Sequence, residues 1–309
     1  MTNYAHDSNI FVSFVYLSYS YSKKNHTHIM KKIKEKLGFL LLTLSAILIL
    51  LIVTILFLFI GIQGIQVINL EFLFSFPREG MTSGGIFPAV FGTVALTLIT
   101  TLFSIPCGIG AAIYLSEYAK EGRLTSFIRA SIRNLAGVPS IVYGLFGVAL
   151  FVQSFNLGTS ILASGLTLGL LTLPWVIAVS EEAIKSVPRS FREGALALGA
   201  TKWQTTRLVL RYATPGILTG AILGLSRAAG ETAPILFTGV CFWLPTLPSS
   251  IFDQFMALPY HLYILSTQHY DLEKVRPIAF GTAFVLVAFV FGMNLVALII
   301  RTKLRKDYG

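Results

Sequence analysis

The stretch NLAGVPSIVYGLFGVALFVQSFNLGTSILASGLTLGLLTLPWVIAVS, residues 134–180, carries no charged side chain over 47 consecutive positions. A helix that crosses a lipid bilayer needs about 20 apolar residues, so this stretch is long enough for two crossings. A polar break within it, QSFNLG at residues 153–158, contains residue types that form turns. The stretch therefore predicts a tight hairpin of two transmembrane helices.

The composition of the whole chain also indicates a membrane protein. Of the 309 residues, 54% are hydrophobic and only 12% are charged, and the mean hydropathy is +0.74. Soluble domains carry about 25% charged residues. The net charge of +10 does not indicate a nucleic-acid partner, because the basic residues form four clusters separated by long uncharged runs. We therefore expect an all-α integral membrane protein in contact with membrane lipid.

Four more apolar runs of spanning length flank the hairpin. They are Gly38–Ile62, Ile86–Leu115, Gly216–Val240 and Pro277–Ile300. Together they predict six transmembrane helices, with both termini on the same side. Twenty lysines and arginines fall in the leader, the tail and two loops on that side, and only three fall in the opposite loops. This asymmetry predicts that both termini are cytoplasmic.

The predicted organisation has four parts. They are a cytoplasmic leader (1–36), the first transmembrane helix with its outer loop (37–85), the transmembrane domain (86–300) and a cytoplasmic tail (301–309). The apolar segment of the leader, IFVSFVYLSYSY, has only 12 residues and is too short to span. From Met30 a basic start precedes a long apolar run, as in a signal anchor. We expect Met30 to be the true start, and residues 1–29 to be disordered or an artefact of start-site choice.

The loop between the fourth and fifth predicted spans, at about residues 188–212, is charged but has regular local signals. Ser190 with Glu193 matches the capping box S-x-x-E, in which each side chain satisfies an unpaired backbone N–H at a helix start. Gly199 is the residue type that most easily ends a helix in the left-handed conformation. Thr201 with Gln204 matches a second box. These signals predict two short helices, joined at Gly199, on the cytoplasmic surface.

Two interpretations of this loop are open. It can lie on the lipid surface with its arginines towards anionic headgroups. Alternatively, it is a rigid docking knob, in which small residues at Gly194, Ala195 and Gly199 let a partner approach closely. Leu196 and Leu198 would then supply the apolar contact.

The segment EGALALG, followed at a distance by VLRYATPGI, resembles the EAA loop of the permease subunits of bacterial ABC importers. That loop has the pattern E-A-A, three residues, G, then nine residues and I-x-L-P. Glu193, Ala195 and Gly199 are in register with the pattern. The departures from it are Gly194, Val209, Arg211 and Tyr212.

The chain also resembles one branch of this family, the phosphate permeases of the PstA type, over residues 38–305. Three motifs carry this resemblance, in the order EGALALGA, RAAGETAPILFTG and MALPYHLY. The resemblance implies the type I ABC importer permease fold in the bacterial plasma membrane. It implies contact with an ATPase subunit for Glu193, Ala195, Leu196 and Gly199. The partners it implies are a homologous second permease, a dimeric ATPase subunit and an extracytoplasmic phosphate-binding protein.

The sequence lacks the motif that binds nucleotide phosphates. It contains no G-x-x-x-x-G-K-[ST] stretch and no Gly-Lys pair. We therefore expect a non-catalytic subunit without a cofactor of its own, with ATP and magnesium bound by the partner ATPase. The histidines and cysteines show no spacing typical of a metal site.

The stretch RAAGETAPILFTG places Arg227 and Glu231 one helical turn apart inside a predicted span. One interpretation is a structural i, i+4 pair, in which each charge neutralises the other. The other is the polar lining of an anion path, because charges within membrane segments usually face a cavity. In that case Thr232 adds a hydroxyl group, and Pro234 kinks the helix and opens it there.

The carboxylate is informative about the anion. The planar fork of an arginine donates two hydrogen bonds to one oxyanion. Near neutral pH phosphate keeps a proton that it can donate to a carboxylate, whereas sulfate has none. The pair therefore favours phosphate, and the predicted function is import of inorganic phosphate by an ATP-driven complex.

Three alternatives are open. One is a permease for another oxyanion, such as sulfate or molybdate. Another is a stand-alone secondary transporter, although an ordered knob and the absence of a visible inverted repeat favour a half-transporter. The last is a membrane signalling scaffold, in which the knob recruits a regulator.

Overall fold

The computed structural model describes residues 4–308, with side chains described from residue 35 to residue 303. The chain divides into two units, Met1–Phe59 and Ile60–Gly309. The first unit lies within α1 (Tyr4–Ile65), of which Glu35–Ile65 is long and apolar enough to span a membrane. The backbone of α1 shows no break at residue 36, where the leader was expected to end. α1 includes residues 4–29, which were expected to be disordered or an artefact of start-site choice. The expectation that Met30 is the true start stays a prediction.

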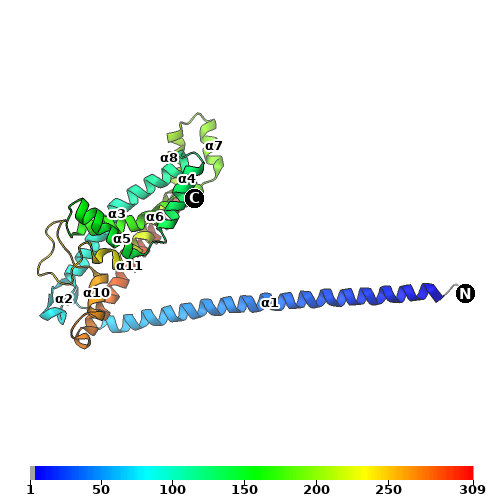
Figure 1. Ribbon diagram of the computed structural model, residues 1–309, viewed down its shortest axis with the longest axis horizontal. Helices are drawn as coiled ribbons and strands as arrows, with labels where there is room; N and C mark the ends of the chain where they lie inside the picture. The colour runs from blue at the N-terminus through cyan, green and yellow to red at the C-terminus, as the bar shows by residue number, and fades with distance from the viewer. Residues whose placement is uncertain (1–3, 309) are drawn as a thin grey trace. The chain divides into compact units, whose positions relative to one another are not determined.

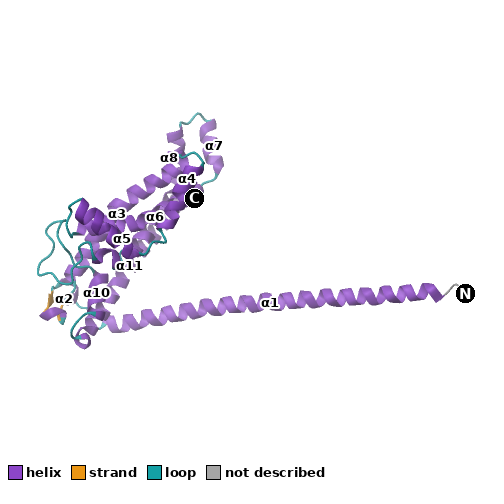
Figure 2. Cartoon of the chain, in the orientation of Figure 1, coloured by secondary structure: helices purple, strands orange, loops and turns teal. Residues whose placement is uncertain are grey.

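The second unit is almost entirely helical (Figures 1 and 2). Its only described sheet is a short antiparallel pair, β1 with β2. In chain order its elements are α2 (Leu70–Phe74), β1 (Pro77–Arg78), η1 (Glu79–Met81), β2 (Ser83–Gly84), α3 (Phe87–Ile113), η2 (Tyr114–Tyr118), α4 (Arg123–Leu135), α5 (Ser140–Gly147), η3 (Val148–Ser154), α6 (Ile161–Lys185), α7 (Arg189–Ala197), α8 (Lys202–Ala228), α9 (Ala233–Leu236), α10 (Leu258–Thr267) and α11 (Leu272–Tyr308). The prediction of an all-α protein is confirmed.

Five of the described helices, α1, α3, α6, α8 and α11, are long and apolar enough to cross a membrane. A sixth crossing results if α4 and α5 with η3 are taken as one broken span, bent by 102°. The predicted hairpin, residues 134–180, corresponds to α5 with η3 and to α6, whereas α4 lies in the segment that was expected to be a cytoplasmic loop. The bend between α4 and α5 follows Leu135, where Gly137 and Pro139 interrupt the helix because the residue before a proline disfavours the helical conformation.

The predicted fifth span, Gly216–Val240, is wrong at both ends. α8 begins at Lys202, so the second helix of the charged loop is the first part of a long helix. The helix ends at Ala228, and the chain turns before Pro234, which has no backbone N–H to continue the ladder. The outer loop that follows contains α10.

Glycines bring the central helices together. On α8, Gly216, Gly220 and Gly224 face Ala183, Val179 and Trp175 of α6, in that order. On α6, Gly165 and Gly169 face Ile99 and Phe103 of α3. A β-carbon at each of these glycines would collide with the facing residue, so the helices pack more closely than larger residues allow. This small-residue ridge fixes α3, α6 and α8 as one packed layer.

The second unit has two distinct ends. Figure 1 shows α7 and the loop after it at one end, and α2 and α10 at the other. α8 runs from the first of these ends towards the interior of the unit. We call the α7 end the coupling end.

Replacing Gly220 with leucine is expected to separate α6 from α8, because the new side chain would overlap Val179. Overpacking a well-packed core at this position is expected to lower the free energy of unfolding by about 2 kcal/mol. Gly292→Leu is the matched control, since Gly292 lies in the long helix α11 with nothing within 4 Å of its added β-carbon. Thermal unfolding of the purified protein in detergent measures both variants. Equal melting temperatures for the two variants would contradict the packing role.

His261 on α10 is buried, and neither of its ring nitrogens has a hydrogen-bond partner among the described residues. Burial disfavours the charged form and lowers the pKa of His261 from 6.5 to about 4. The unfolded chain therefore takes up this proton at higher pH than the folded chain. The contribution of neutral His261 to the free energy of unfolding is fully present above the unfolded pKa of 6.5 and decreases as the pH falls towards 4.

Acidification to about pH 5 is expected to cost about 2 kcal/mol of stability through His261 alone. His261→Phe keeps a ring of similar shape without a titrating group, and the variant should lose that part of the pH dependence. Melting temperatures of both proteins at pH 7 and pH 5 test this. A variant whose pH dependence matches that of the parent chain would show that other groups are responsible.

Candidate functional site

Arg227 and Glu231 lie close together, but they do not share a continuous helix. Arg227 is in the last turn of α8, and Glu231 lies in the turn beyond Ala228. The Nε atom of Arg227 is 3.7 Å from Oε1 of Glu231. This separation gives charge attraction without a hydrogen bond. The expectation of a pair within one span is therefore wrong about the helix and right about the proximity.

Pro234 was expected to kink a helix, and this expectation is wrong. It lies in the first turn of α9, a position that proline tolerates because the N–H there has no helical partner. Thr232 precedes α9 and makes no capping hydrogen bond through its side chain.

A pocket of about 300 Å³ contains both charged residues. Its walls come from the turn between α4 and α5, from the middle of α6, and from the end of α8. The lining residues are Ala136, Gly137, Val138, Pro139, Ser140, Leu171, Thr172, Trp175, Gly224, Arg227, Ala228 and Glu231. Thr232 is not among them. Because Thr172 lies near the midpoint of α6, the pocket lies near the middle of a spanning helix.

The two charges differ in exposure. The Glu231 side chain is 21% exposed, whereas that of Arg227 is 73% exposed. Among the described residues Arg227 has no hydrogen-bond partner, so its terminal nitrogens are open to an incoming anion. A guanidinium at this depth is costly against lipid tails, so its exposed face has to meet water, an anion or another protein chain.

The coupling end is built as the local signals indicated, with one exception. Thr201 and Gln204 form the predicted capping box at the start of α8, and Gly199 is left-handed with φ of 81°. The box predicted for Ser190 and Glu193 is wrong. The N-cap of α7 is Pro188, two residues before Ser190, and no side chain caps the helix.

The predicted coupling residues lie together on an accessible surface. Glu193, Leu196 and Gly199 are exposed, and Ala195 is half-buried. Leu198 is 91% exposed, and an added β-carbon at Gly194 or Gly199 would meet nothing within 4 Å. The surface therefore offers apolar side chains beside open backbone, which suits close approach of a partner.

Sequence reasoning missed an arginine that holds this surface in place. Arg192 on α7 donates to Glu117 of η2, with 2.7 Å from Nη2 to Oε1. It also donates to the backbone oxygens of Val187, at 2.8 Å, and Ile184, at 3.0 Å. Glu117 is only 8% exposed. The pair ties α7 to the end of α3 and to the end of α6.

A second ion network lies beside it. Arg129 on α4 donates to Glu181 of α6 at 2.7 Å, to Glu121 at 3.0 Å and to the backbone oxygen of Leu115 at 2.8 Å. Lys185 also contacts Glu181, at 2.6 Å. The network joins α4, α6 and the end of α3 at the coupling end.

Residues 104–308 match the family described as the inner membrane component of binding-protein-dependent transport systems. The chain belongs to this family. It is a multi-pass membrane protein and a permease subunit of an ABC transporter.

Similar proteins cover most of this permease. A probable ABC transporter permease of Bacillus subtilis (strain 168), YqgI, is 35% identical over 288 residues, which are 89% of this chain and 98% of the relative. The phosphate transport system permease PstA of Xylella fastidiosa (strain 9a5c) is 33% identical over 250 residues, or 79% and 85% of the two chains.

Solved structures show the same fold. A chain of a bacterial alginate ABC transporter aligns with a TM-score of 0.59 at 17% identity, covering 88% of this permease and 93% of that chain. The predicted type I ABC importer permease fold is confirmed, as is the relationship to PstA-type permeases.

The permease sequence contains a signal for the missed ion pairs. Glu117 and Glu181 stand at the cytoplasmic-facing ends, in the predicted topology, of two long uncharged runs. A carboxylate at such a place is costly unless a cation meets it. The sequence did not reveal which arginine does so, because the partners of Glu117 and Glu181 lie 75 and 52 residues away along the chain.

Breaking the Arg192 pair is expected to loosen α7. Arg192→Gln leaves the nearly buried Glu117 unpaired, with a cost of about 2 kcal/mol. Arg189→Gln is the control, since Arg189 is exposed on the same helix. Hydrogen exchange of the α7 amides should be faster in the first variant only. Equal exchange in both variants would contradict a positioning role for Arg192.

Proposed function

We propose that this permease carries inorganic phosphate into the cell as one half of an ATP-driven importer in the plasma membrane. The observation that supports it most directly is the open guanidinium of Arg227, beside Glu231, in a pocket near the middle of the spanning helices. An isolated pair of this kind contributes little to stability, because solvent screens the attraction of an exposed arginine. Its exposed, incompletely bonded geometry is better explained by a passing anion.

The chemistry of the pair supports phosphate among the oxyanions. Arg227 offers two donors in one plane to two oxygens of the anion. Glu231 repels a fully deprotonated dianion, but it accepts a hydrogen bond from an anion that still carries a proton. The relatives named as phosphate transport permeases point in the same direction.

The position of the pair explains why a partner is needed. Arg227 lies on the surface of the single chain, so a second surface is required to enclose the path. A homologous permease facing this one across the pocket would supply it. The pocket would then be shared, and each chain alone would bind phosphate weakly, as a path that must also release its cargo requires.

The remaining partners follow from the two ends of the molecule. The surface of α7, around Glu193, Ala195, Leu196 and Gly199, is proposed to dock on a dimeric ATPase subunit that binds ATP and magnesium. The opposite end is proposed to receive phosphate from an extracytoplasmic binding protein. In this arrangement the termini and the coupling end face the cytoplasm, which agrees with the asymmetry of basic residues.

Uptake of radiolabelled phosphate tests the proposal. It is measured in cells without another high-affinity importer, supplied with the complete operon. Arg227→Gln should reduce uptake at least about tenfold, because a charge-assisted contact with the anion is lost. Arg78→Gln is the control, since Arg78 is an exposed arginine paired with Glu71 far from the pocket. Membrane levels and co-purification of the other subunits are checked for every variant.

Glu231→Gln separates phosphate from sulfate. The variant should lose phosphate uptake and allow sulfate to compete, because an amide can donate a hydrogen bond to a fully deprotonated anion. Normal phosphate uptake by both pocket variants would contradict the proposal. Phosphate uptake that sulfate still does not inhibit in Glu231→Gln would show that Glu231 does not select the anion.

A further inference from the structure

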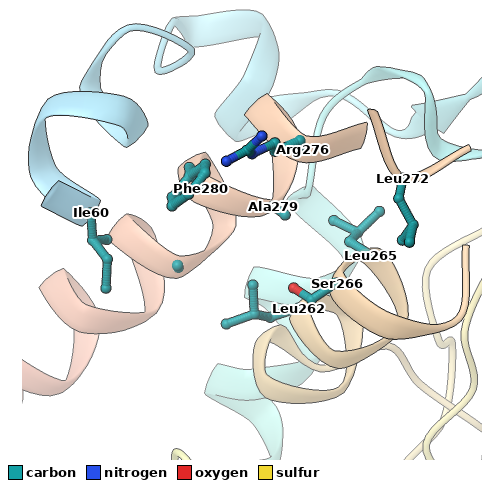
Figure 3. A pocket seen from close by; sticks show the side chains of 9 residues that line it. Ile60, Leu262, Leu265, Ser266, Leu272, Arg276, Ala279 and Phe280 are labelled. Atoms are coloured by element: carbon teal, nitrogen blue, oxygen red, sulfur yellow. The ribbon is translucent and has the colours of Figure 1, made fainter. Parts of the chain in front are cut away.

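A second pocket lies at the end of the unit opposite the coupling end (Figure 3). Its volume is about 380 Å³, within the range of pockets that hold small molecules. Figure 3 shows Leu262, Leu265 and Ser266 of α10 on one side, and Arg276 and Phe280 of α11 on the other. Leu272, Ala279, Ala283 and Ile60 complete the lining.

The lining has an apolar body and one cation. Seven of its nine residues are apolar, and the polar ones are Ser266 and Arg276. Both of these are exposed, so the polar groups lie at the surface while Leu265 and Ala279 are buried. A ligand that fits this pocket has an apolar chain and an anionic head.

Arg276 differs from the other basic residues at this end. Arg78 pairs with Glu71 at 3.4 Å, and Lys274 pairs with Asp271 at 3.0 Å. Arg276 has no carboxylate partner within the described part of the chain. An arginine without a partner beside an apolar cavity is complementary to a phosphate group, which it binds through two hydrogen bonds.

The depth of the pocket identifies the source of such a ligand. Arg276 lies one turn after the start of α11, and Ile60 lies near the end of the helix that spans from Glu35 to Ile65. The pocket is therefore at the boundary between the hydrocarbon core and the headgroups, where long cationic side chains extend to the interface. Below it α11 exposes large apolar side chains, among them Phe291, Leu295 and Ile299, which suit contact with lipid tails.

We propose that this pocket binds an anionic phospholipid, with an acyl chain between α10 and α11 and the headgroup phosphate on Arg276. The site is separate from the Arg227 pocket and does not depend on which anion is transported. α10 also carries the buried His261, so an occupied pocket would support the packing of this helix against α11.

Native mass spectrometry of the full-length chain with its co-purifying subunits tests the site. The protein is reconstituted in nanodiscs that contain equal amounts of phosphatidylglycerol and phosphatidylcholine, and the lipids it retains on release are counted. The parent chain should retain more phosphatidylglycerol than phosphatidylcholine. Arg276→Gln should lower that preference about fivefold, as expected for one cationic contact at a membrane surface.

Two further variants make the result specific. Lys274→Gln removes a neighbouring charge that does not line the pocket, and it should retain the preference of the parent chain. Ala283→Phe fills the pocket and leaves Arg276 in place, so it should lower retention of both lipids. Unfolding temperatures confirm that each variant is folded.

Several outcomes would overturn the proposal. One is equal retention of the two lipids by the parent chain, and another is an unchanged preference in Arg276→Gln. Displacement of the retained lipid by added inorganic phosphate would show a free-anion site instead. A photocrosslinker at Ser266 that captures another subunit rather than lipid would assign the pocket to a protein interface.

Discussion

The close approach of α6 and α8 is the constraint on which the other features of this permease depend. Three glycines at successive helical turns of α8 face a ridge of α6 formed by Ala183, Val179 and Trp175. In a membrane the hydrophobic effect does not drive helices together, so contact between backbones provides much of the attraction. The end of α8 is thereby brought to the middle of α6, and the Arg227 pocket is formed between them.

The two ends of α8 lie at the two proposed functional regions. The helix starts at the capping box of Thr201 and ends next to Arg227, and its 27 residues extend about 40 Å. At the start, Arg192 and Glu117 join α7 to the ends of α3 and α6. The α7 surface is therefore joined to the long helices by packing and by partly buried ion pairs. This arrangement would suit the proposed role, in which α7 docks on an ATPase subunit and the Arg227 pocket forms part of the anion path.

The charges of this permease fall into two groups with different roles. Arg129, Glu181, Arg192 and Glu117 are mostly shielded and bonded to one another, so they hold helix ends together. Arg227 and Arg276 are exposed and incompletely bonded, so they are available to anions. The first group is held by partners within the chain, and the second group lines the two pockets described above. Both groups contain arginines, so it is the presence or absence of hydrogen-bond partners, and not the residue type, that distinguishes them.

The sequence by itself determined the class of the fold, the approximate spans and the position of the charged loop. Uncharged runs are a local property, and their lengths are set by the thickness of the bilayer. Local hydrogen bonding likewise made the Thr201 box and the left-handed Gly199 predictable. Boundaries that depend on neighbours were wrong, as at the start of α7 and at both ends of α8. Only the tertiary structure decided that Arg227 and Glu231 meet across a turn, that Thr232 lies outside their pocket, and that Arg192 pairs with Glu117. The Arg192–Glu117 pair and the lining of the Arg227 pocket join residues on different elements, and such contacts are fixed by how the helices pack rather than by spacing along the chain.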